Sequence, residues 1–207
     1  MTTDIAGRMR GVPEQPAGLR YEPELLDSTQ ERVLTAAVER YDFQPVVMHG
    51  QAARRTVRHF GFGYDYESGR PLPGDPLPPE LIDLRERCAA LAGVAAQGLA
   101  EALVTRYPPG ATIGWHRDAP AFGPVVVGVS LVSAATMRFQ RRVAGERRVF
   151  QLTLEPRSAY VLAGAARAAW QHSIPPVPAL RYSVTFRSLR GDAPGGSPCD
   201  GTPPGRR

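Results

Sequence analysis

Residues 181–187 read Arg-Tyr-Ser-Val-Thr-Phe-Arg, and this stretch carries a clear strand signal. Successive side chains of a β-strand point to opposite faces. Tyr182, Val184 and Phe186 therefore share one apolar face, which indicates burial. The opposite face carries an arginine at each end. Because an unpaired guanidinium costs several kcal/mol to bury, this face either reaches solvent, as ordinary surface arginines do, or meets an anion.

The rest of the chain supplies partners for this strand. Short strand candidates separated by Gly, Pro and charged turns fill the chain after Ala102: Leu103–Tyr107, Val125–Val132, Thr136–Gln140, Val149–Leu154, Ala159–Leu162 and Arg181–Leu189. Two helices precede them, one near 28–40 behind an Asp27/Gln30 capping box and one opened by Pro79. Helices followed by many short strands predict an α+β fold with a double-stranded β-helix (jelly roll) core.

Length and composition indicate one domain. The chain has 207 residues, of which 43% are hydrophobic, and this suffices for one sizeable core. We expect a disordered arm over 1–17, a single domain over 18–190 with its jelly roll at about 101–190, and a disordered tail over 191–207. Because no stretch is apolar enough to form a signal region or a membrane span, we expect a soluble, cytoplasmic protein with no membrane contact. We also expect it to be a monomer with no obligate protein partner.

The charge balance favours a polyanionic partner. The net charge is +5 and the pI is near 9.7, values typical of nucleic-acid-binding proteins. All 25 basic residues are arginines, however, and such a bias also arises from coding preference. The two cysteines, Cys88 and Cys199, lie far apart, which excludes a disulfide framework and a CxxC zinc site.

A candidate metal site lies in Trp115-His116-Arg117-Asp118. His116 and Asp118 stand two residues apart, so on an extended chain they project to the same side. His172, at the end of a later strand candidate, offers a third ligand. Two histidines and one carboxylate leave three coordination positions open, which non-haem Fe(II) oxygenases need for a bidentate cosubstrate and O₂.

Other interpretations of these three residues remain open. A His-x-Asp pair also arises by chance, and His172 equally fits a capping or core position. Zinc prefers a nearly closed tetrahedral set, and no fourth Cys, His or Asp lies close in sequence, so Fe(II) is favoured.

Four motifs together resemble the AlkB family of 2-oxoglutarate dioxygenases: Thr105-Arg106-Tyr107-Pro108-Pro109-Gly110, His116-Arg117-Asp118, Gln171-His172-Ser173-Ile174 and the closing RYSVTFR with Arg181 and Arg187. The resemblance covers roughly residues 19–190. It implies that His116, Asp118 and His172 bind Fe(II), and that 2-oxoglutarate and O₂ are cosubstrates.

The resemblance also assigns the cosubstrate contacts. It implies that Tyr107 and Arg181 bind the distal carboxylate of 2-oxoglutarate, and that Arg187 binds near the carboxylate beside the keto group. Ser183 and Thr105 stand where AlkB itself has asparagines, and their hydroxyls retain the ability to hydrogen-bond.

A nucleotide-recognition lid is expected at about 42–76. In the place of the family's lid, arginines at 54, 55 and 58 precede a run of aromatic residues. We expect Arg54, Arg55 and Arg58 to contact phosphates, and one of the aromatics Phe60, Phe62 and Tyr64 to stack on an extruded base. The alternative is a solvated charge run beside an aromatic core strand. The sequence of this segment resembles that of the family branch which contains the eukaryotic tRNA-modifying homologue.

These observations predict a dioxygenase that demethylates or hydroxylates a base in DNA or RNA. Ala119 and Pro120 replace the acidic base contacts that AlkB itself has after its His-x-Asp motif, so AlkB's substrate is not carried over. One alternative is the same chemistry on a protein side chain or a small molecule. A third is a non-catalytic nucleic-acid-binding module, against which the intact ligand and arginine motifs argue.

Overall fold

The computed structural model describes residues 14–48, 50–65 and 70–189, with the backbone alone at Met48, 63–65 and 70–73. The tail expected over 191–207 and most of the arm expected over 1–17 lie outside these residues. The helices are α1 (Ser28–Val38), α2 (Pro79–Ala92), the 3₁₀ turn η1 (Ala96–Gly98) and α3 (Gly164–Ala168). The strands are β1 (Leu19–Glu22), β2 (Gln44–Met48), β3 (Gln51–Phe60), β4 (Phe62–Asp65), β5 (Arg70–Pro73), β6 (Glu101–Tyr107), β7 (Ile113–His116), β8 (Phe122–Leu131), β9 (Ala135–Val143), β10 (Glu146–Leu154), β11 (Ala159–Leu162), β12 (Gln171–Ile174) and β13 (Arg181–Leu189).

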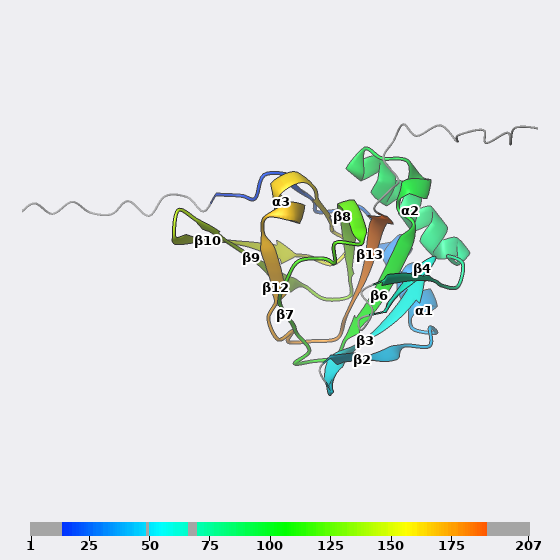
Figure 1. The fold of residues 1–207 in the computed structure, drawn as a ribbon. Coiled ribbons are helices and arrows are strands. Elements are labelled where there is room, and N and C mark those ends of the chain that lie inside the picture. The colour runs from blue at the N-terminus through cyan, green and yellow to red at the C-terminus, as the bar shows by residue number, and fades with distance from the viewer. Residues whose placement is uncertain (1–13, 49, 66–69, 190–207) are drawn as a thin grey trace, which may run out of the picture.

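Two antiparallel sheets form the body of the protein (Figure 1). The larger has seven strands in the order β1-β11-β8-β13-β6-β3-β2, and the smaller has four in the order β10-β9-β12-β7. Strand β13, predicted from the alternation in residues 181–187, lies near the centre of the larger sheet between β8 and β6. The jelly-roll core is therefore confirmed.

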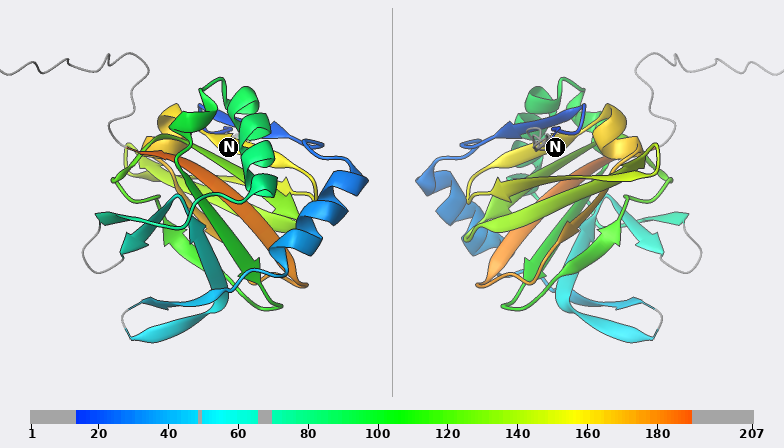
Figure 2. Two further views of the ribbon diagram at one scale, coloured as in Figure 1. Left: turned by 90° about the vertical axis from the view of Figure 1, so that its right-hand side faces the viewer. Right: turned by 90° about the vertical axis from the view of Figure 1, so that its left-hand side faces the viewer.

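Helices α1 and α2 cover the outer face of the larger sheet (Figure 2). Helix α1 begins at the predicted capping box, in which Asp27 accepts from the backbone of Gln30 and the Gln30 side chain accepts from the backbone of Asp27. Helix α2 begins with Pro79 at its first position. Among the described residues, no helix is long and apolar enough to cross a membrane.

The two faces of β13 are buried against different partners. Tyr182, Val184 and Phe186 pack beneath the helices, in a core that includes Leu81 and Leu84 of α2. Fully burying each aliphatic or aromatic side chain contributes about 1.5–3 kcal/mol. The opposite face, with the arginines, points between the two sheets. A second core formed by Tyr107, Met137, Phe139, Leu154, Tyr160, Leu162 and Trp170 holds the sheets together.

The segment expected as a lid divides into two parts at Gly61. Strand β3 pairs with β6 and extends the larger sheet, while β4 and β5 form a separate two-stranded hairpin. Gly61 between them has φ of +76°, and a Cβ at this position would lie 2.1 Å from the carbonyl oxygen of Ala100. Only glycine fits this bend. Phe60 and Phe62 therefore lie in different strands, whereas their spacing in the sequence is compatible with a single strand.

Candidate active site

His116, Asp118 and His172 come together between the sheets. His116 ends β7 and is the direct cross-strand partner of His172 in β12. Their ring centroids lie 4.3 Å apart. Asp118 follows two residues after His116, and its Oδ2 atom lies 3.7 Å from Nε2 of His172. The structure thus assembles the three residues that the sequence singled out.

The local contacts hold these side chains in the state that binds a metal. Nδ1 of His116 lies 2.9 Å from the carbonyl oxygen of Gly114. A carbonyl oxygen only accepts, so Nδ1 carries the proton and Nε2 stays available as a ligand. Burial lowers the pKa of His172 to about 3, so this ring is neutral near pH 7. Its Nδ1 is buried and has no hydrogen-bond partner among the described residues.

Asp118 is held as a carboxylate. Burial raises the pKa of its carboxyl group, but the positive groups around it, Arg187 first among them, together outweigh this effect and lower the pKa to about 2. Nε of Arg187 donates to Oδ1 of Asp118 at 2.8 Å. Within the described residues, no three His, Cys, Asp or Glu side chains are already arranged around a metal position. Two imidazoles and one carboxylate nevertheless supply the donor set that Fe(II) takes in non-haem oxygenases, and the residues present fit that ion.

Arg181 lies at the other end of the same pocket with its charge largely uncompensated. The side chain is 2% exposed, and its guanidinium lies over the ring of Tyr107, 5.0 Å from the centroid. Nη2 donates to Oγ of Ser130 at 2.9 Å, whereas Nε and Nη1 are buried without a partner among the described residues. Each unpaired buried donor costs about 1–3 kcal/mol, and a ligand carboxylate in the pocket would satisfy one of them. The site therefore fits one end of a dicarboxylate.

All eight residues predicted for the metal and the cosubstrate line one pocket. They are Thr105, Tyr107, His116, Asp118, His172, Arg181, Ser183 and Arg187. Sequence reasoning missed Ser130 and Tyr160, which also face this region. Gly128 stands directly opposite Tyr160, and a Cβ there would lie within 2.5 Å of the phenol ring. The missing side chain at Gly128 therefore makes room for Tyr160.

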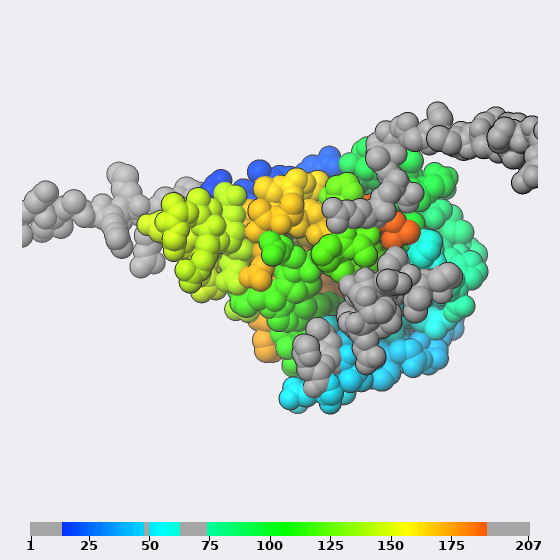
Figure 3. Space-filling view, in the orientation of Figure 1, coloured from blue at the N-terminus to red at the C-terminus, as the bar shows by residue number. Residues whose placement is uncertain are grey.

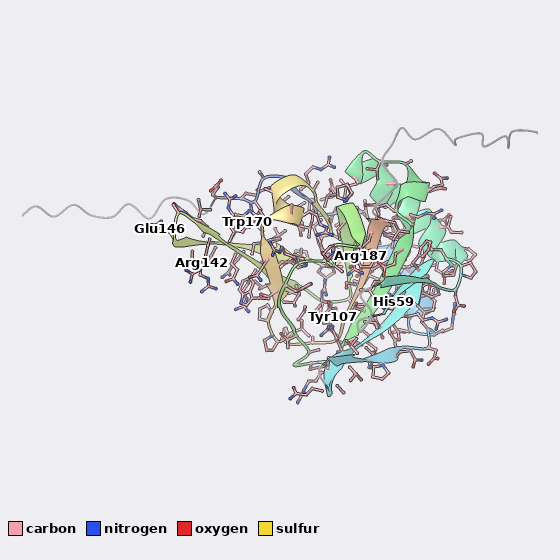
Figure 4. The ribbon with its side chains drawn as sticks, viewed as in Figure 1. His59, Tyr107, Arg142, Glu146, Trp170 and Arg187 are labelled. Atoms are coloured by element: carbon pink, nitrogen blue, oxygen red, sulfur yellow. The ribbon has the colours of Figure 1, made fainter. Side chains whose placement is uncertain are left out.

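A charged network connects the site to strand β3. Glu101 has 0% exposure, and its carboxylate accepts from Nη1 of Arg187 at 2.9 and 3.3 Å. Its Oε1 also lies 3.0 Å from Nδ1 of His59. Arg187 thus bridges two carboxylates, Glu101 on one side and Asp118 on the other. Figure 4 labels Arg187 and His59, the two residues that contact Glu101. Sequence spacing gave no sign of Glu101.

The loop after Asp118 is fixed from α3. Arg167 donates to the carbonyl oxygens of Asp118, Ala119 and Phe122 at 3.1–3.2 Å. Every residue type has a backbone carbonyl group, so the residue types around Asp118 did not indicate that Arg167 would bind there.

The expected lid residues lie at different places. Arg58 is paired with Asp75 and lies over Phe60, and Arg55 donates to the carbonyl oxygen of Thr112 at 3.4 Å. Arg54 is exposed and adjoins Gly110. Phe60 is 7% exposed and packs against Tyr41, which matches the alternative of an aromatic core strand for this residue. Phe62 is half-buried, and the side chain of Tyr64 lies outside the described residues.

Comparison with known families agrees with this geometry. A family model described as the 2OG-Fe(II) oxygenase superfamily matches residues 23–187, and the chain belongs to this superfamily. Two solved structures have the same fold: that of OsALKBH1, with a TM-score of 0.61 over 84% of this chain and 98% of that chain at 17% identity, and a Pseudomonas putida prolyl-4-hydroxylase, with 0.60 over 84% and 93% at 15% identity.

Within the superfamily, the similar curated proteins are of the AlkB type. The chain is 30% identical over 178 residues to the mouse tRNA (carboxymethyluridine(34)-5-O)-methyltransferase ALKBH8, covering 80% of this chain and 25% of that protein. It is 32% identical over 148 residues to the dioxygenase AlkB of Salmonella typhimurium, covering 64% of this chain and 65% of that protein. The chain thus spans about a quarter of the length of the mouse relative.

Proposed function

We propose that this dioxygenase oxidises an alkylated or otherwise modified base in nucleic acid, with Fe(II) held by His116, Asp118 and His172. The iron assignment rests mainly on one observation: the pairing of β7 with β12 brings His116 and His172 together beside Asp118. In this arrangement Asp118 is ionised and His172 is neutral. With 2-oxoglutarate and O₂, the bound iron supplies the oxidation of a C–H bond while the cosubstrate is converted to succinate and CO₂.

The protein's own residues bind and orient the reactants. Arg181, which has unpaired buried donors, receives the distal carboxylate of 2-oxoglutarate together with Tyr107, and Thr105 and Ser183 line the same pocket. Arg187 keeps the Asp118 carboxylate ionised and oriented, and it lies next to the position expected for the carboxylate beside the keto group.

Nucleic acid is favoured as substrate by the relatives and by charge. A zebrafish relative that is 28% identical over 136 residues, 64% of this chain and 54% of that protein, is named a probable RNA/DNA demethylase, ALKBH6. The net charge of +5 also suits a polyanion. Oxidation of an N-alkyl carbon gives a product that releases an aldehyde and restores the base, whereas oxidation of a ring substituent leaves a stable alcohol.

A direct test is to incubate the iron-loaded protein with 2-oxoglutarate and a panel of methylated DNA and RNA oligonucleotides and tRNA. Mass spectrometry follows each base, and succinate is measured in the same samples. We expect succinate formation to rise with one class of nucleic acid and to match the amount of base oxidised. Succinate formation stimulated only by peptides or small molecules would move the assignment to the same chemistry on those substrates.

A further inference from the structure

A second basic surface lies on the far side of the four-stranded sheet from the iron ligands. On β12, His172 stands opposite Phe139, while its neighbour Gln171 stands opposite Gln140. Because side chains alternate between faces, Gln140 and Arg142 lie on the outer face of the sheet and His172 on the inner one. This outer face has a hollow lined by Trp115, Gln140, Arg141, Arg142, Arg147 and Gln171.

The hairpin of β9 and β10 presents these arginines on a projection from the body of the protein. Ala144 and Gly145, with φ of 49° and 84°, join Val143 to Glu146 in a two-residue turn whose twist matches the flanking strands. The hairpin extends away from the body of the protein, with Arg142 near its end (Figures 3 and 4).

The arginines of this hairpin face one another. On the outer face, Arg147 is the direct cross-strand partner of Arg142. Like charges at such positions destabilise a sheet. Within the described part of the chain, neither Arg142 nor Arg147 has an ion-pair partner. A bound anion would remove this repulsion, whereas water only screens it.

Trp115 supplies a platform on the same surface. The guanidinium groups of Arg138 and Arg147 both lie close to its ring, at 5.1 and 5.7 Å from the centroid. Such cation–π contacts orient the side chains and limit the entropy lost when they bind a ligand. Arg138 and Arg142 stand four residues apart, about 13 Å along an extended strand. One strand of a duplex carries about four phosphates over that length.

We propose that this outer surface of β9 and β10 binds the phosphate backbone of nucleic acid that flanks the base held in the iron pocket. The inference rests on the proposed function for its choice of polyanion. The charges are spread along a strand, which matches a polymer better than a single phosphate. By contrast, two of the three arginines expected to contact phosphate from β3 already have partners, Arg58 with Asp75 and Arg55 with the Thr112 carbonyl oxygen.

The test compares two double variants of the full chain. Arg142→Ala/Arg147→Ala removes the opposed pair, and Arg40→Ala/Arg87→Ala removes the same charge from exposed positions near the helices. Fluorescence anisotropy with labelled single-stranded DNA and RNA, between about 50 and 200 mM salt, gives the slope of log affinity against log salt. We expect the slope to fall by about 1.4 in the first variant, about 0.7 for each lost phosphate contact, and to stay unchanged in the control.

Two further readouts separate the possible failures. Thermal unfolding of the first variant should occur at or above the wild-type temperature, because a repulsive pair is removed, and turnover of 2-oxoglutarate without substrate should persist. An unchanged salt slope in a protein that still oxidises bases would overturn the outer-surface site and leave the proposed function standing. If the slope falls but no base is oxidised, the phosphate-binding surface is supported and the proposed function fails. Loss of binding to anionic vesicles, with nucleic-acid binding intact, would overturn the site in favour of a membrane surface.

Discussion

Replacing Glu101 by glutamine should destabilise the protein and weaken its use of 2-oxoglutarate. The side chain has 0% exposure, and its carboxylate binds Arg187 at 2.9 Å and contacts His59. Removing one member of a buried ion pair costs about 3–5 kcal/mol, because the remaining charge is left without its partner. The amide keeps one acceptor oxygen for Arg187, which places Glu101→Gln at the lower end, about 3 kcal/mol.

For a chain of this size, each kcal/mol lowers the midpoint of thermal unfolding by about 2–4 °C, so Glu101→Gln should lower Tm by about 6–12 °C. Arg187 also loses an anchor and orients Asp118 less well, so KM for 2-oxoglutarate should rise below the new Tm. Differential scanning calorimetry and a succinate assay measure the two effects. The exposed Glu86→Gln is the matched control and should change neither. A Glu101→Gln protein with wild-type Tm and wild-type KM would refute the role given to this network.

Two further predictions concern buried polar groups. Arg181→Lys should weaken 2-oxoglutarate binding at least tenfold by calorimetric titration, because one ammonium cannot replace the planar set of donors on the guanidinium, and Arg40→Lys should have no effect. An unchanged affinity would show that Arg181 does not contact the cosubstrate. Burial raises the pKa of the Cys88 thiol to about 12, so at pH 8 only about one molecule in ten thousand carries the thiolate, against roughly a quarter for a free cysteine with pKa near 8.5. Peptide mapping after iodoacetamide treatment should find Cys88 unmodified in the native protein and alkylated in guanidinium chloride, and rapid labelling of the native protein at this residue would contradict its burial.

The strand and ligand pattern could be predicted because the signals are local. Strand β13 follows from strict alternation, and α1 from a capping box within four residues. His116 and Asp118 are two residues apart. His172 was proposed as the distant third ligand because it ends a later strand candidate, and the resemblance to a family implied the same role. Strand β1 has only four residues and shows no such pattern, so it was not predicted. Its position depends on its pairing with the distant strand β11.

The remaining features depend on contacts between distant segments. Glu101 resembles any surface glutamate in the sequence, and only the pairing of β6 with β13 brings it to Arg187. Phe60 was expected in a lid because the bend at Gly61, forced by the nearby Ala100 carbonyl, cannot be inferred from neighbouring residues. Likewise, the arginines of β9 and β10 form one surface only through their cross-strand register.

Anaerobic calorimetric titration of Fe(II) into the wild-type protein and the variants His116→Ala, Asp118→Ala and His172→Ala measures whether these three residues hold the iron. We expect one iron per chain for the wild type, a loss of measurable binding in each variant, and no succinate formation by any of the three. A His172→Ala protein that binds iron with unchanged affinity and still forms succinate would show that His172 is not an iron ligand.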